Sequence, residues 1–383
     1  MKEKINNIEF SSTLFLILFS CTLGIAPYIT IKIAGIDSYI GVIIGSIIGL
    51  IPLFIFIYIF NYEIDKPIYQ KTKIIFGNTL GTIINIFLTI LYFILAITIL
   101  FNTSNFIISQ YLTDTPIKLV IIILSLTAYH TSNKGITTIS KISLIYTLII
   151  IILFIMATIG LIPEIELDNL KPVLEYGIKN PIIAGMTYSL VLTIPISSLL
   201  IIPKKEIENY YKTTKYIIIT YLVTTIMIIF MSLVASACLG RYLISMYQYP
   251  VYITLKKISI FGFIDRIENF LSIEWILSTF VAFTLPIINI QSNINKKNNK
   301  IINLIIIIII IIATMILFKN NTSFNHYLDS IYPYILLIIL IIYIIIFITI
   351  IIKKGIKKKR VIANDETHRN DRAAVGDPCH RRR

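Results

Sequence analysis

Apolar runs long enough to cross a lipid bilayer recur along almost the whole of this 383-residue sequence. A transmembrane helix needs about 20 consecutive apolar residues. Charged residues make up 14% of the chain, whereas soluble domains carry about 25%. The runs are continuous and do not alternate between apolar and polar positions, so they do not fit the strand pattern of an outer-membrane barrel. The sequence therefore predicts an all-α polytopic membrane protein.

Positive charge in the loops predicts how the spans are oriented. Short cytoplasmic loops of membrane proteins carry an excess of Lys and Arg. Before the C-terminal tail, the loops on the N-terminal side hold fourteen of these residues and the opposite loops hold nine. Both termini are therefore predicted to be cytoplasmic, which requires an even number of spans. Ten are predicted, at residues 10–33, 36–60, 80–101, 117–130, 139–162, 182–202, 214–240, 269–291, 301–318 and 331–352.

The remaining composition narrows the function classes. The net charge of +14 is concentrated in the loops and the tail, so it does not predict nucleic-acid binding. Cysteine and histidine spacing indicates no metal site, cofactor or catalytic triad, and an enzyme is not predicted. Residues 361–383 contain one isoleucine but five of the eight arginines. We interpret them as a disordered or artefactual basic tail after a permease-like domain at residues 1–360.

Two of the predicted spans are interrupted near their middle by residues that disfavour a helix. In lipid, unwound backbone is tolerated where it lines a cavity, because its polar groups need partners. The first interruption comprises Gly24, Ile25, Ala26 and Pro27, and the second comprises Thr193, Ile194, Pro195, Ile196, Ser197 and Ser198.

The two interruptions lie in spans one and six, which are five spans apart. Transporters built from inverted repeats place broken helices at corresponding positions in their two halves, with the substrate between them. The spacing thus favours a LeuT-like 5+5 inverted repeat with broken helices 1 and 6. Two independent proline kinks would give the same pattern, and this alternative stays open.

The interruptions carry backbone amides, hydroxyls and small residues but no charged side chain. Half-helix ends supply partial charges of both signs, so the predicted ligand is small and neutral or zwitterionic, such as an amino acid. Tyr92 in the third span is a candidate for a further wall of this site. It also has a structural interpretation, as an ordinary residue of the helix core.

Ionisable residues inside membrane spans often mark function. The candidates here are Glu274, in the eighth predicted span, and Arg266 and Glu268 near its start. The alternative for this group is an interfacial charge cluster that positions the end of the helix.

Three stretches of the sequence resemble a known family. They are LGIAPYITIKIAGIDSYIGVIIGSIIG at 23–49, PVLEYGIKNPIIAGMTYSLVLTIPISSLLIIPKKE at 172–206 and YPVYITLKKISIFGFIDRIENFLSIEW at 249–275. They are similar to the B subunits of bacterial spore germinant receptors, within the amino acid-polyamine-organocation permease superfamily. The resemblance extends over roughly residues 5–352 and is most specific at 249–275.

The resemblance implies a ten-span permease architecture and a location in the spore inner membrane or cell membrane. It also implies a receptor A subunit and a lipoprotein C subunit as partners. The family's ligand pocket would lie between the two interruptions. The leading hypothesis is a membrane subunit that binds a germinant, such as an amino acid, and signals to its partners. A secondary amino-acid transporter and an ion-release channel or scaffold component of the germination apparatus are the alternatives.

Overall fold

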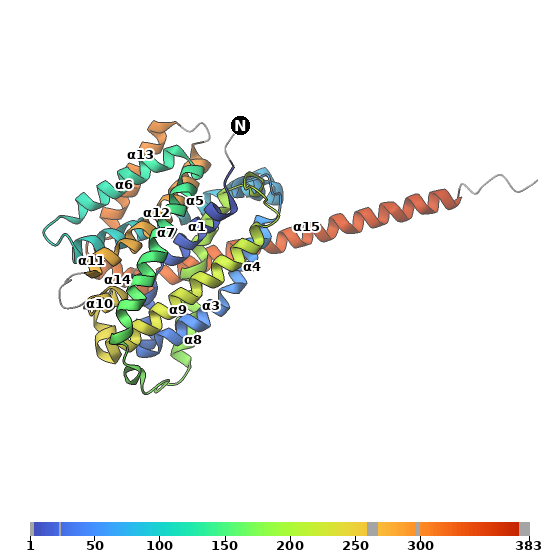
Figure 1. Ribbon diagram of the computed structural model, residues 1–383. Helices are drawn as coiled ribbons and strands as arrows, with labels where there is room; N and C mark the ends of the chain where they lie inside the picture. The colour runs from blue at the N-terminus through green and yellow to red at the C-terminus, as the bar shows by residue number, and fades with distance from the viewer. Residues whose placement is uncertain (1–3, 23, 259–266, 296–298, 375–383) are drawn as a thin grey trace, which may run out of the picture.

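The computed structural model describes the chain except for residues 1–3, 23, 259–266, 296–298 and 375–383, and it describes only the backbone of residues 267, 271 and 356–374. In this part of the chain the fold is built from helices (Figure 1). No β-strand occurs among the described residues, where Ile5 and Ile207 form one isolated parallel bridge.

The first half of the chain contains α1 to α7. The first predicted span is divided into α1 and α2, and the second is divided at Gly49 into α3 and α4. The bounds are α1 Asn7–Ser20, α2 Ile25–Ala34, η1 Gly35–Asp37, α3 Ser38–Ile48, α4 Leu50–Phe60, α5 Ile68–Gln110, α6 Ile117–Lys134 and α7 Ile136–Leu161.

The second half begins after a loop with two short 3₁₀ turns, η2 Ile162–Glu164 and η3 Leu167–Leu170. The sixth predicted span consists of an α-helix followed directly by a 3₁₀ helix. The bounds are α8 Lys179–Thr193, η4 Ile194–Ile201, η5 Lys204–Glu206, α9 Thr213–Met246, α10 Pro250–Leu255, α11 Ile267–Leu271, α12 Ile273–Ile294, α13 Lys300–Leu317, α14 Asn321–Ser330 and α15 Tyr332–Ala374.

Every predicted span coincides with helical structure. Eight stretches among the described residues are long and apolar enough to cross a membrane, and they show an integral membrane protein. Helix α1 has 14 residues and forms a full span only together with α2, while α6 is not among the eight. The last helix continues along the backbone to Ala374. The assignment of residues 361–383 to a separate tail stays a prediction.

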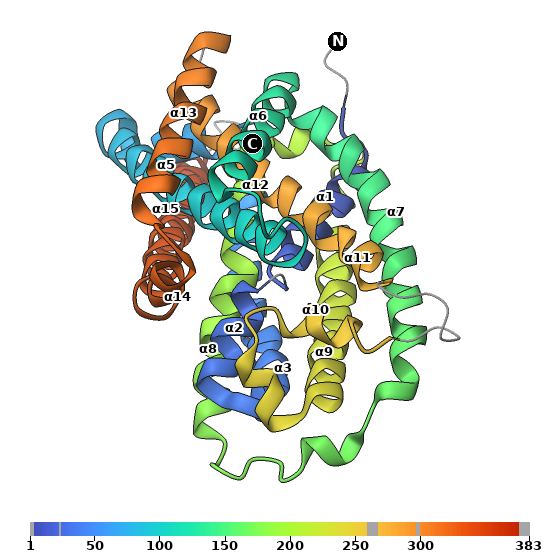
Figure 2. The same ribbon diagram turned by 90° about the vertical axis from the view of Figure 1, so that its left-hand side faces the viewer.

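The helices form two neighbouring groups (Figure 2). In one group, α1, α2, α3, α8 and α9 pack against one another, and in the other group α5 packs against α6, α12 and α13. Helices α12 and α8–η4 lie between neighbours, with 76% and 72% of their apolar windows buried, whereas α7 is only 22% buried. The second predicted broken helix, α8–η4, is therefore one of the most buried spans.

Helices α3 and α8 approach each other almost backbone to backbone. A Cβ atom added at Gly45 would lie 2.5 Å from the carbonyl oxygen of Gly185, and one added at Gly41 would lie 2.9 Å from Ala184 Cβ. Small residues spaced four apart permit this distance between membrane helices, where close van der Waals packing replaces the hydrophobic effect. The contact fixes which face of α3 meets α8, and it thereby places Ser38 and Val42 at the cavity described below.

Candidate functional site

The first predicted interruption is a true break in the helix. Helix α1 ends at Ser20 and α2 begins at Ile25. Gly24 precedes α2 with φ 73° and ψ −46°, a backbone conformation that is costly for residues with a Cβ atom. Side chains satisfy carbonyls freed by the break, since the Ser20 hydroxyl donates to Ile17 O and the Thr22 hydroxyl donates to Phe19 O, both at 2.7 Å. These two hydroxyls therefore compensate part of the cost of unwinding the backbone at this depth.

The ring of Tyr249 covers Gly24. A Cβ atom at position 24 would lie 2.6 Å from Tyr249 Cε1. The Tyr249 hydroxyl accepts a hydrogen bond of 2.8 Å from Asn105 Nδ2, and its ring packs edge-on to Phe106 at 5.0 Å between centroids. The segment before α10 therefore closes over the break, and only glycine fits beneath it.

Helix α12 contacts the same break from the other group of helices. Trp275 Nε1 donates to the Thr22 hydroxyl at 2.9 Å. The neighbouring Glu274 is 1% exposed, and its Oε2 has no hydrogen-bond partner in the described part of the chain. Burying an unpaired carboxylate is costly, so this residue is a candidate for function, as the sequence predicts, but its role stays a prediction.

The second predicted interruption is also present. At Thr193 the α-helix gives way to the 3₁₀ helix η4, with Pro195 in its first turn. The Tyr92 hydroxyl donates to Ser197 O at 3.0 Å and lies 2.6 Å from the Tyr343 hydroxyl. Asn289 Nδ2 donates to Ser198 O at 2.8 Å. Side chains from α5 and α12 thus satisfy carbonyls that η4 leaves without helical partners, and Tyr343 of α15 contacts the Tyr92 hydroxyl.

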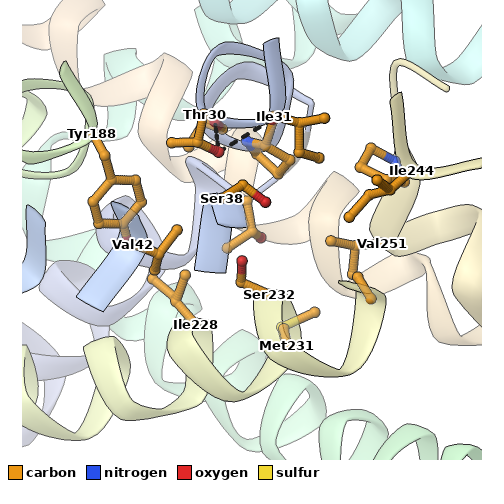
Figure 3. A pocket seen from close by; sticks show the side chains of 15 residues that line it. Thr30, Ile31, Ser38, Val42, Tyr188, Ile228, Met231, Ser232, Ile244 and Val251 are labelled. Atoms are coloured by element: carbon orange, nitrogen blue, oxygen red, sulfur yellow. Dashed lines mark hydrogen bonds between the residues drawn. The ribbon is translucent and has the colours of Figure 1, made fainter. Parts of the chain in front are cut away.

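A narrow cavity lies beside the first break (Figure 3); it comprises about 410 Å³ including space open to solvent, of which only about 20 Å³ can hold the centre of a water molecule. It has room for about one water molecule, so a larger ligand requires the helices around it to separate. Hydroxyl groups of Thr22, Thr30, Ser38 and Ser232 line it, and no charged side chain does. Ser38 Oγ is buried and has no hydrogen-bond partner among the described residues, so it is available to a ligand. The apolar part of the lining is Ala26, Pro27, Ile31, Val42, Tyr188, Ile228, Met231, Ala235, Ile244, Pro250 and Val251.

The structure separates the predicted ligand-binding residues into two places. Ala26 and Pro27 line the cavity, whereas Gly24 and Ile25 do not. Thr193, Ile194, Pro195, Ser197 and Ser198 are also outside that lining, and Tyr92 contacts Ser197 instead. The sequence marks the breaks because Gly and Pro act locally, but which residues surround a cavity depends on how distant helices pack. The ligand-binding roles stay predictions.

Of the two other predicted charges, the structure describes one, Glu268. Glu268 is nearly buried in α11. Asn269, its neighbour, accepts hydrogen bonds from Tyr252 at 3.0 Å and Tyr111 at 3.3 Å. Arg266 lies outside the described residues.

Sequence reasoning missed several residues of the site. Ser38, Thr30 and Tyr188 line the cavity, and Tyr249 covers Gly24. The four-residue spacing of Gly41 and Gly45 could have indicated Ser38, Thr30 and Tyr188, because this spacing identifies the face of α3 that packs against its neighbours. Tyr249 opens the stretch at 249–275 that carries the family resemblance, but its place over Gly24 depends on the fold of the segment between α9 and α10.

Two larger vestibules lie on opposite faces of the fold. One, of about 1330 Å³ including space open to solvent, is lined by Asp65, Gln70, Pro203 and Asn295. It lies on the N-terminal face, because Ile5 N donates to Glu206 O at 3.1 Å. The other, of about 1100 Å³ including space open to solvent, is lined by Tyr28, Lys32, Gln248 and Asn325 at the far ends of α2 and α9. We call it the outer vestibule because it lies on the face away from the N-terminus.

The hydrogen bonds around Ser197 give a first prediction. Tyr92→Phe should lower the free energy of unfolding by about 1–3 kcal/mol, because it removes the donor to a buried carbonyl. Tyr343→Phe should cost less, because Tyr92 would retain its bond to Ser197 O. Thermal unfolding of the two purified variants in detergent tests this order. Equal losses would mean that the carbonyl of Ser197 has another partner.

Comparison with known proteins decides the family. A profile described as spore germination protein matches residues 4–323. The chain belongs to the spore germination protein family. The chain is 24% identical over 202 residues to spore germination protein XB of Bacillus anthracis, covering 52% of this chain and 56% of that protein. It is 25% identical over 173 residues to spore germination protein A2 of Bacillus subtilis (strain 168), covering 45% and 47%. The matches thus span about half the length of each relative.

A solved structure confirms the predicted fold class. Mhp1, a nucleobase-cation-symport-1 family transporter in a closed conformation with bromovinylhydantoin bound, superposes with a TM-score of 0.61. The alignment covers 85% of this chain and 75% of that chain, at 14% sequence identity. The chain therefore has a LeuT-like transporter fold. At this identity the likeness concerns the fold alone.

Proposed function

We propose that this protein is the germinant-binding membrane subunit of a spore germination receptor and that it binds a free amino acid in the cavity beside the first break. The cavity carries the proposal. It adjoins unwound backbone, offers hydroxyls from several helices, and has no charged lining. Hydroxyl groups both donate and accept hydrogen bonds, so they can bind a carboxylate and an ammonium group. A single net charge would be buried without a partner.

The rest of the proposal concerns where the protein acts and with what. Family membership supports a receptor A subunit and a lipoprotein C subunit as partners in the spore inner membrane. Cytoplasmic termini are supported by the contact between the N-terminal segment and the lysine-bearing loop before α9. In that contact, Glu208 N donates to Ile5 O at 2.9 Å. Binding in the cavity would alter the packing of α2, and the partners would detect this change.

Filling the cavity tests the binding site. We expect Ala26→Phe to weaken amino-acid binding by at least about ten-fold, because the added ring occupies the space between α2 and α3. Equilibrium dialysis of the full chain in lipid nanodiscs, with the twenty amino acids radiolabelled and tested singly, measures the affinity.

Ala157→Phe is the matched control, because Ala157 lines a different cavity with Phe154 and Leu161. It should leave the affinity within about two-fold of wild type. If no amino acid binds the wild-type protein, the proposed function is wrong. If binding survives Ala26→Phe, the ligand lies elsewhere.

A secondary amino-acid transporter is the second candidate. The observation that favours it is the pair of vestibules on opposite faces, which alternating access requires. Uptake of a labelled amino acid into proteoliposomes separates the two functions. Saturable accumulation would identify a transporter, whereas binding without accumulation would identify a receptor that retains the transporter fold.

A further inference from the structure

The outer vestibule contains polar groups that its own hydrogen bonds leave unused. It lies between the outer end of α2, the end of α9 and the helix α14, which lies near α2 in Figure 2. Its lining includes Tyr28, Lys32, Ser245, Gln248, Asn321 and Asn325. The hydroxyl cavity described above has none of these polar residues.

A directed chain of amides leads into the vestibule from the Tyr249 ring. Asn105 Nδ2 donates both to the Tyr249 hydroxyl, at 2.8 Å, and to Asn321 Oδ1, at 3.1 Å. Asn321 Nδ2 in turn donates to Gln248 Oε1 at 2.5 Å. Asn321, in the middle of the chain, accepts through its oxygen and donates through its nitrogen. The last free group is therefore the Gln248 amide nitrogen.

Two atoms of this lining are buried without partners among the described residues. They are Gln248 Nε2, a hydrogen-bond donor, and Asn325 Oδ1, an acceptor. Buried polar atoms are nearly always satisfied, so an unmatched donor and acceptor in one vestibule indicate a ligand that supplies both partners. Gln248 lies between α9 and α10, and Asn325 lies in α14. The loss of one local hydrogen bond therefore does not explain both unpaired atoms.

An ion pair lies at the edge of the vestibule: Lys32 is part of the lining, and Asp329, which is not, follows Asn325 by one turn of α14. Lys32 Nζ forms an ion pair with Asp329, whose Oδ2 also accepts a hydrogen bond of 3.2 Å from the Tyr28 hydroxyl. The Lys32 side chain is 55% exposed, so its ammonium group has donors left for a ligand. The lining thus combines a cation with an amide donor and an amide acceptor, and the carboxylate of Asp329 lies on the same helix as that acceptor.

We propose that the outer vestibule is a second binding site, which takes a free amino acid as a zwitterion. The Gln248 amide and Lys32 bind its carboxylate, and Asn325 Oδ1 and Asp329 bind its ammonium group. Ile31 lines both this vestibule and the inner cavity, so the two sites are separated by one side chain. The inference rests on the proposed function, because it assumes that the protein binds amino acids. Its test follows the labelling of a residue in the vestibule and is therefore separate from the test of the inner cavity.

Protection of an introduced thiol tests the proposal. Ser245 is an exposed residue of the lining, and its hydroxyl already donates to Arg241 O at 2.9 Å. Ser245→Cys is made in the full chain with Cys379→Ser, since Cys21 and Cys238 are buried. The protein in nanodiscs is then labelled with a charged methanethiosulfonate reagent in the presence of each of the twenty amino acids. We expect at least one to slow labelling by about five-fold at saturation.

Two isosteric changes should shift this protection in opposite directions. Gln248→Glu keeps the oxygen that accepts from Asn321 but replaces the free donor with a negative charge. It should raise the half-protecting concentration by about ten-fold or more. Asn325→Asp places a negative charge against the ammonium group and should lower that concentration. Gln110→Glu, the same charge change on that face but outside the lining, should have no effect.

The outcomes separate this site from the inner cavity. Protection that survives Ala26→Phe but is weakened by Gln248→Glu supports a second site. Amino-acid binding in dialysis without protection of the thiol overturns the vestibule site and leaves the proposed function intact. If Ala26→Phe abolishes protection, there is one site and not two. If both isosteric changes weaken protection, the vestibule binds an anion, and the zwitterion assignment is wrong.

Discussion

Gly45→Ala is expected to destabilise the protein by about 3 kcal/mol, which is at the upper end for overpacking a tight interface. The new Cβ atom would lie 2.5 Å from the carbonyl oxygen of Gly185 and 2.6 Å from Tyr188 Cδ1. The nearest obstacle is helix backbone, which cannot rotate away as a side chain would. Helices α3 and α8 must therefore separate along their length. Chemical or thermal unfolding in detergent measures the loss.

Gly355→Ala is the matched control for the Gly45 prediction. Gly355 lies in α15, and nothing surrounds the position of its missing Cβ within 4 Å. In a helix, Gly to Ala without a steric conflict stabilises by about 0.5–1 kcal/mol. The same substitution should thus act with opposite sign at the two positions. Equal stability of Gly45→Ala and wild type would show that α3 and α8 are further apart than described.

The sequence was most informative where a structural signal is local. The apolar runs predict the spans, because helix length in lipid depends only on consecutive residues. The breaks after Ser20 and at Thr193 follow from Gly24 and Pro195 in the same way, since both residues disfavour a helix wherever they occur. The resemblance to spore germinant receptor subunits also led to the family that the profile match shows.

The arrangement of the site could not be predicted, because it depends on contacts between distant segments. Tyr92 and Ser197 are 105 residues apart, and their hydrogen bond requires α5 to lie beside η4. Ser38 faces the cavity only because Gly41 and Gly45 hold α3 against α8. The sequence predicts one pocket that includes both breaks. The structure instead places the first break beside a hydroxyl cavity and the second in a cluster of tyrosine and asparagine side chains.

Gly24→Ala is expected to have the largest effect at the site itself, for two separable reasons. The backbone at Gly24 has φ 73°, and a Cβ atom there would lie 2.6 Å from Tyr249 Cε1. Gly35, at the other end of α2, has φ 57° but nothing within 4 Å of the added atom. Gly35→Ala should therefore cost about 1–2 kcal/mol from backbone strain alone. Gly24→Ala should cost about 3 kcal/mol, because the steric conflict adds to the strain.

Tyr249→Ala separates the steric cost of Gly24→Ala from the cost of its backbone strain. With the ring removed, Gly24→Ala should cost no more than Gly35→Ala, which gives a coupling energy of about 1–2 kcal/mol between positions 24 and 249. Unfolding of the two single variants, the double variant and the wild type supplies this cycle, and dialysis on the same samples measures amino-acid binding. A coupling near zero would mean that Tyr249 does not cover the break. A measured coupling would establish that the segment before α10 packs on the first broken helix, a contact through which the proposed binding beside α2 could reach that segment.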